Sequence, residues 1–145
     1  MIQLVKKFTR LSAVRKRLLL QTLILSVYTQ VLFRFFKKSA RFGQAADIDS
    51  KTQQPDAKAL DIAYAIQAVD KLVPWQNVCR HQAYQAKMLC SWNRLPYMIF
   101  VGFKKDKETN KIQAHAWTVA GGKIITGFCN PNEYTIQNVY QNEWQ

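Results

Sequence analysis

The sequence predicts an α+β fold in which helices come first and a small antiparallel sheet follows. Three observations predict it. Apolar residues repeat at steps of three or four within residues 18–36 and again within residues 56–72, which is typical of helices. From residue 97 the pattern changes to β-branched and aromatic runs, at 97–103 and 112–120. A Gly-Gly pair then makes a tight turn into residues 123–126, so these strands are antiparallel.

The length and the charge of the chain limit its class. A chain of 145 residues fits one domain and buries roughly two thirds of its unfolded surface. The net charge is +12, and residues 1–44 hold ten Lys or Arg and no Asp or Glu, which leaves +2 for the rest. We therefore divide the chain into a basic helical segment, residues 1–44, and a core, residues 45–145. The charge lies on an apolar helix without a nucleic-acid motif, so we expect no nucleic-acid partner.

The apolar N-terminal helix has a broad stripe at helical spacing. Its members are Leu20, Ile24, Val27, Val31 and Phe35, widened by Leu25, Tyr28 and Leu32. Polar residues interrupt the run and no cleavage site follows it, which disfavours both a membrane span and a signal peptide. Two alternatives remain: the helix docks on the domain or on a partner, or it lies on a membrane surface with basic flanks. The second would hold a cytoplasmic protein at the inner face of the membrane.

The cysteines indicate a reducing compartment. Cys79, Cys90 and Cys129 are odd in number and have no CxxC spacing, which argues against a disulfide framework and against structural zinc. We expect neither a metal nor another cofactor. Cys90 shares a small-residue helix face with Ala83 and Ala86, so it is expected in the core rather than as a reactive thiol.

Cys79 is the residue best placed for chemistry. Residues 78–94 are expected to form a helix that begins near Cys79, where unpaired N–H groups and the helix dipole favour a thiolate. His115 lies on the predicted strand 112–120 and could act as its acid and base once the fold joins them. On that strand His115 shares a face with Trp117, which is either core or a roof over the site. His81, beside Cys79, is expected at the solvent or substrate rim rather than in catalysis.

Three stretches in this order resemble a known family. They are PWQNVCRHQAYQAKML, RLPYMIFVGFKK and QAHAWTVAGGKIITG. Within the papain and transglutaminase group, they resemble the transglutaminase-like leader peptidases of lasso-peptide biosynthesis. Relatives show a proline and a tryptophan shortly before the cysteine, a strand ending in glycine, and the histidine inside an AHAW word. The resemblance implies a papain/transglutaminase-like core whose antiparallel sheet packs on the cysteine-bearing helix.

The resemblance also implies an activity and partners. Cys79 would be the nucleophile and His115 the general base and acid, in a peptidase that cuts the leader from a ribosomally made precursor peptide. An ATP-dependent lasso cyclase would then close the ring, and a separate leader-recognition protein would present the precursor to this split, stand-alone form. N–H groups at the helix start would receive the oxyanion, with Gln76 or Trp75 as further candidate donors.

The third catalytic residue departs from the family pattern. Relatives often carry an aspartate on the strand after the histidine, whereas residues 123–128 contain no acid and Gly127 stands at the expected place. Asn130 is the nearest polar candidate, since asparagine serves in papain-like enzymes. The departure keeps two alternatives open: another thiol acyl-transfer enzyme of the same fold, such as an amidase or a transglutaminase, and a catalytically weak scaffold or interaction subunit.

Overall fold

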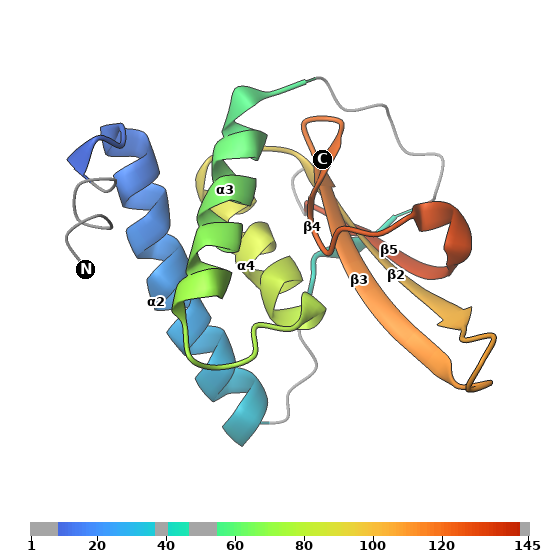
Figure 1. The fold of residues 1–145 in the computed structure, drawn as a ribbon. Helices are drawn as coiled ribbons and strands as arrows, with labels where there is room; N and C mark the ends of the chain where they lie inside the picture. The colour runs from blue at the N-terminus through green and yellow to red at the C-terminus, as the bar shows by residue number, and fades with distance from the viewer. Residues whose placement is uncertain (1–8, 37–40, 47–54, 143–145) are drawn as a thin grey trace.

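In the computed structural model of the chain, helices α3 and α4 cover one face of a five-stranded antiparallel sheet, and helix α2 lies on their far side (Figure 1). The structure describes residues 9–36, 41–46 and 55–142. The helices are α2 (Ala13–Phe35), α3 (Ala57–Leu72) and α4 (Cys79–Trp92). The predicted α+β fold is confirmed, including the packing of the sheet on the cysteine-bearing helix.

The three helices begin differently. Ser12 caps α2, because its hydroxyl accepts a hydrogen bond from the N–H of Arg15, and the carboxylate of Asp56 caps α3 by accepting from the N–H of Lys58. Val78 precedes α4 and offers no side-chain cap. The N-terminus of α4, where Cys79 stands, is therefore the one of the three without a side-chain cap.

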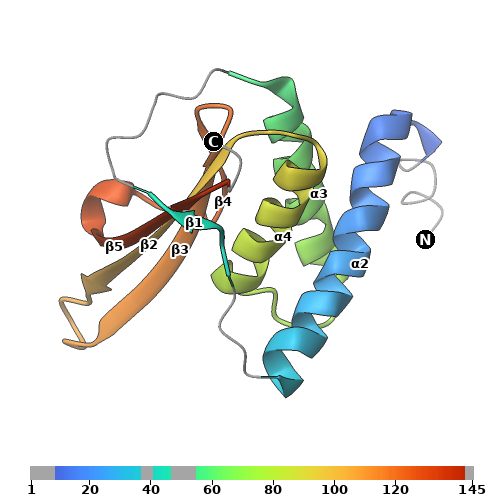
Figure 2. The ribbon, with the colours of Figure 1, turned by 180° about the vertical axis from the view of Figure 1, so that it is seen from behind.

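The sheet has the order β1-β5-β2-β3-β4. Its strands are β1 (Gln44–Ala45), β2 (Tyr97–Lys105), β3 (Ile112–Ala120), β4 (Lys123–Thr126) and β5 (Thr135–Gln141), and a short 3-10 helix, η1 (Pro131–Glu133), precedes β5. The bounds of β3 and β4 agree with the prediction. The sequence did not predict β1, which lies beside β5 at the edge of the sheet (Figure 2). Gly43 permits this approach, since a Cβ there would collide with the carbonyl of Gln141.

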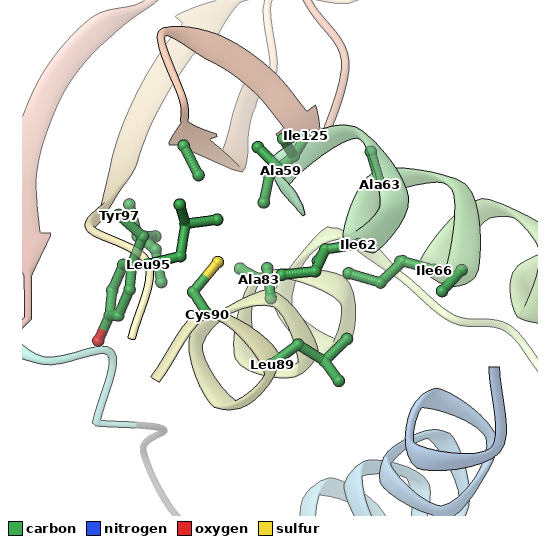
Figure 3. Packing of buried hydrophobic residues seen from close by; sticks show 14 of the residues in the cluster. Ala59, Ile62, Ala63, Ile66, Ala83, Leu89, Cys90, Leu95, Tyr97 and Ile125 are labelled. Carbon is green, nitrogen blue, oxygen red and sulfur yellow. The ribbon is translucent and has the colours of Figure 1, made fainter. Parts of the chain in front are cut away.

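The core lies between the sheet and helices α3 and α4 (Figure 3). Alanines on α4 let that helix come close to the sheet, as its small-residue face predicted. Cys90 is fully buried among these residues, and burial raises the pKa of its thiol to about 12, which confirms it as a core residue. The main contributors are Ile62, Ile66, Ala83, Ala86, Leu89, Tyr97, Ile99, Ala116 and Ile125.

Helix α2 docks on the domain through only a small part of its apolar stripe, Leu25 and the half-buried Leu32. Leu20, Ile24 and Phe35, which the sequence placed on the docking face, are exposed. The buried residues of the helix are instead Leu18, Thr22, Leu25, Ser26, Thr29 and Phe33. The prediction was wrong for the exposed part of the stripe, because hydropathy periodicity does not show that Thr22, Ser26 and Thr29 are buried beside Leu18, Leu25 and Phe33. The division of the chain at residue 44 stays a prediction from composition, since α2 shares a core with α3 and α4.

A buried polar network joins α2 to α4 and to the loop before α4. Gln85 on α4 donates from Nε2 to Oδ1 of Asn77 (2.9 Å) and to Oγ1 of Thr29 (3.2 Å), and Nδ2 of Asn77 donates back to Oε1 of Gln85 (3.3 Å). Trp75 donates from its indole to Oγ of Ser26 (3.0 Å). The two amides and the Thr29 hydroxyl are buried, so their hydrogen bonds replace water. The network therefore fixes residues 73–78, and with them the place where α4 begins.

His81 is buried in the same interface, contrary to the predicted rim position. It is 7% exposed, and its ring stacks on Phe33 of α2 with centroids 5.0 Å apart. The guanidinium of Arg80 lies 4.3 Å from the centroid of the same Phe33 ring. Burial lowers the pKa of His81, the charge of Arg80 lowers it further, and a hydrogen bond to the Gln76 backbone acts in the opposite direction. The first-turn histidine is thus an uncharged packing residue.

Replacement of Gln85 by leucine should destabilise the fold. Asn77 and Thr29 would keep their buried polar groups and lose their shared partner, which costs about 1–3 kcal/mol of unfolding free energy. Urea unfolding measures the loss. Gln67→Leu is the matched control, because Gln67 is exposed on α3, and it should change stability by less than about 0.5 kcal/mol. Equal effects of the two substitutions would contradict the network.

Stability should fall in acid because of His81. Its pKa in the folded state lies below the ordinary 6.5, so at lower pH the unfolded chain binds a proton more readily than the folded chain does. The contribution is intact above about pH 6.5 and is lost as the pH falls below that value. Urea unfolding at about pH 7.5 and about pH 5.5 should show a larger loss for the native chain than for His81→Phe, which keeps the stacking but cannot titrate. An identical loss in both would show that another group is responsible.

Candidate active site

Cys79 is the first residue of α4 and is half-buried. The carbonyl of Val78 accepts the N–H groups of His81 (2.8 Å) and Gln82 (3.1 Å). Within the described residues this leaves the N–H groups of Cys79 and Arg80 at the open end of the helix. The first turn contains no acid, so nothing there offsets the positive end of the helix dipole. The position suits both a nucleophilic sulfur and an oxyanion.

His115 lies on β3, a strand that packs on α4. Its Nε2 is 2.9 Å from the carbonyl oxygen of Gly127. A carbonyl can only accept, so Nε2 is the nitrogen that donates, and the lone pair of the neutral ring is on Nδ1. The ring also stacks on Tyr134, with centroids 5.4 Å apart, and on Trp117 at 6.3 Å.

The two predicted catalytic side chains face different sides of the sheet. Directly paired residues share a face, and Phe100 pairs with Trp117. These two rings stack 5.5 Å apart on the face away from the helices, where His115 also lies. Cys79 packs instead against the cluster on the helix side, which contains Ala116. Within the chain as described, no hydrogen bond joins Cys79 to His115.

The imidazole lies beside the part of β3 that β4 does not pair with. The pairing of β4 with β3 runs from Ala120 to Thr118 and does not reach His115. His115 is half-buried, whereas Trp117 is almost fully buried. Of the two interpretations offered for Trp117, the structure shows the core residue. The pairing of Cys79 with His115 stays a prediction.

A backbone carbonyl, that of Gly127, is the hydrogen-bond partner of His115. Gly127 has a φ of +65°, and a Cβ there would collide with the carbonyl of Ala116, so glycine lets this strand end approach β3 closely. Asn130 is exposed, and its Oδ1 accepts the N–H of Asn132 (3.2 Å) and caps η1. The catalytic role of Asn130 stays a prediction. A hydrogen bond to a backbone carbonyl cannot be predicted from residue types. The glycine at position 127 was the only feature of the sequence that hinted at this contact.

The other predicted groups are placed as follows. The indole N–H of Trp75 is engaged by Ser26, so of the two extra oxyanion donors only Gln76, which is exposed, has an uncommitted side chain. Burial raises the pKa of Cys129, Lys104 opposes that shift and Glu133 adds to it. Across the described ranges 9–36, 41–46 and 55–142, no group of three or more His, Cys, Asp or Glu could hold a metal ion.

Comparison with known proteins agrees with this architecture. A model of the transglutaminase-like superfamily matches residues 23–138, which include most of α2, all of α3 and α4, the strand that carries His115, and Gly127. No curated protein and no solved structure matches the chain. The fold of this superfamily supports cysteine-dependent acyl transfer and peptide cleavage. With four fifths of its length covered by that model, the chain belongs to the transglutaminase-like superfamily.

Proposed function

We propose that this protein is a cysteine peptidase that removes the leader from a ribosomally made lasso-peptide precursor before an ATP-dependent cyclase closes the ring. The observation that carries the proposal is the position of Cys79 as the first residue of an uncapped helix. Membership of the superfamily supports thiol-dependent acyl transfer in general. The PW…C and AHAW words of the sequence support the narrower substrate.

The proposed reaction uses two groups at the start of α4. The thiolate of Cys79 attacks the scissile carbonyl carbon, and the oxyanion that forms accepts hydrogen bonds from the N–H groups of Cys79 and Arg80. The C–N bond then breaks, the amine of the core peptide takes a proton from the imidazolium of His115, and the leader remains as a thioester. Water, deprotonated by His115, hydrolyses the thioester and releases the leader with a free carboxylate.

His115 needs a change of position to take part. Its Nδ1 holds the lone pair, but the ring lies on the sheet face away from Cys79. We place the productive ring at the part of β3 that β4 does not pair with, where it reaches the helix side by turning about its side-chain bonds. Catalytic hydrogen bonds are often loose without substrate. The chain alone should therefore be slow, and the bound precursor with its recognition protein should favour the productive arrangement. Gly127 or Asn130 would then orient the ring.

The partners follow from the reaction. The precursor peptide is the substrate, a leader-recognition protein presents it, and the cyclase consumes the new N-terminus. All three fit the cytoplasm, which supplies ATP and keeps thiols reduced.

A second candidate, a catalytically weak interaction subunit, is favoured by one specific observation. The two predicted catalytic side chains face opposite sides of β3, and residues 123–128 contain no acid. A thiol amidase or transglutaminase of the same fold is a third candidate. Mass spectrometry of the products separates it from a peptidase, because amide exchange and peptide cleavage change mass differently.

Replacement of Cys79 by alanine should abolish cleavage of the cognate precursor in the presence of its recognition protein, since the nucleophile is lost. Mass spectrometry detects the released leader. Cys129→Ala is the matched control, because it removes another partly exposed thiol and should leave cleavage within about twofold. Cleavage that survives in Cys79→Ala would support the interaction subunit and end the peptidase proposal.

Replacement of His115 by glutamine should lower the cleavage rate by about 10²-fold or more, the usual contribution of a general acid and base. Glutamine can still donate to Gly127, so the fold should persist, and thermal unfolding checks this. Lys123→Ala, an exposed change on β4, should cleave normally. A His115→Gln variant that is folded and fully active would remove His115 from the mechanism.

A further inference from the structure

The outward face of α2 is apolar along its whole length. Leu20, Ile24, Val27 and Val31 follow one another at steps of four, three and four, so they form one line along the helix. Their exposed fractions are 61%, 60%, 47% and 44%. Further exposed apolar residues widen this line: Val14, Leu23, Tyr28, Phe35 and Phe36. We call these nine residues the outer face of α2.

This pattern departs from that of an ordinary surface helix. A helix docked on a domain in water buries its apolar side and exposes its polar side. Here the buried side includes three hydroxyl residues, Thr22, Ser26 and Thr29, beside Leu18, Leu25 and Phe33. Ser26 and Thr29 bind Trp75 and Gln85, while most of the branched and aromatic residues of the helix point out. More than half of the large apolar side chains exposed on the described part of the chain belong to the outer face. The outer face is thus suited to a non-aqueous surrounding.

Basic residues stand at both ends of the outer face. Lys16 precedes Leu20 by one turn, and Arg34 follows Val31 by nearly one turn, so both flank the same line. Lys16 donates from its ammonium group to the carbonyl of Thr9. Ten bases and no acid occur in residues 1–44. An apolar helix face with cationic ends is complementary to a bilayer with anionic headgroups.

Two other occupants fit less well. A second copy would bring the same ten positive charges against the first, without an acid from this segment to pair them. α2 also has the length and composition of a membrane-spanning helix. However, it is packed against α3 and α4, and a crossing would carry Asp61, Asp70 and the other charged residues of α3 into hydrocarbon.

We infer that the outer face of α2 lies in the surface of an anionic lipid bilayer, parallel to its plane, with Lys16 and Arg34 among the headgroups. The sheet is on the far side of α3 and α4 from α2, so it stays in the aqueous phase (Figure 1). The inference does not depend on the peptidase activity, because it concerns a different surface.

Flotation of the full chain with lipid vesicles tests the inference. Vesicles of mixed phosphatidylglycerol and phosphatidylcholine should carry the protein upward, vesicles of phosphatidylcholine alone should do so much less, and added salt should weaken the binding. The double variant Ile24→Gln, Val27→Gln should bind at least tenfold more weakly. Arg34→Gln should bind about fivefold more weakly.

Leu72→Gln on α3 is the matched control, because Leu72 is as exposed as Leu20 but lies outside the outer face, and it should bind like the native chain. Circular dichroism checks that each variant is folded. Equal binding to both kinds of vesicle, no binding to either, or an unchanged double variant would overturn the inference. So would resistance to alkaline extraction, which marks a span. A dimer in light scattering that the double variant dissolves would assign the face to a second copy.

Discussion

The hydrogen bonds of Gln85 with Asn77 and Thr29 are the constraint on which the start of α4 depends. Each bond stabilises the fold by about 1 kcal/mol, and an unmet buried amide costs more than that. Because both amides are buried, residue 77 has one position relative to α2, and Cys79 follows two residues later. The same bonds explain why α2 turns its hydroxyl groups inward. Its apolar line is left on the outside as a direct result.

Much of the architecture could be predicted from the sequence. The two strands around the Gly-Gly turn were predicted to the residue, because alternation, β-branching and turn chemistry all agree there. The orientation of α2 could not be predicted, since periodicity identifies a stripe without showing what it packs against. His81 was misplaced for a similar reason: its burial depends on Phe33, a residue 48 positions earlier in the chain.

The candidate site was predictable in its parts and less so in its assembly. Helix-start chemistry pointed to Cys79, and the AHAW word pointed to His115. The hydrogen-bond partner of His115 is a backbone carbonyl group. Every residue carries one, so the residue types in the sequence could not predict this partner. The side of the sheet to which a strand turns its odd-numbered residues depends on how the helices dock. Local sequence does not contain that information.

The position of β5 has a consequence for how the chain folds. β5 follows β1 to β4 in the sequence, yet it lies between β1 and β2, and Gln141 and Tyr140 hold Gln44 and Ala45 in register. Until β5 inserts, the hairpin of β2 and β3 has an unpaired backbone edge and β1 has no neighbouring strand. A folding intermediate without β5 therefore exposes strand edges that favour association with other chains.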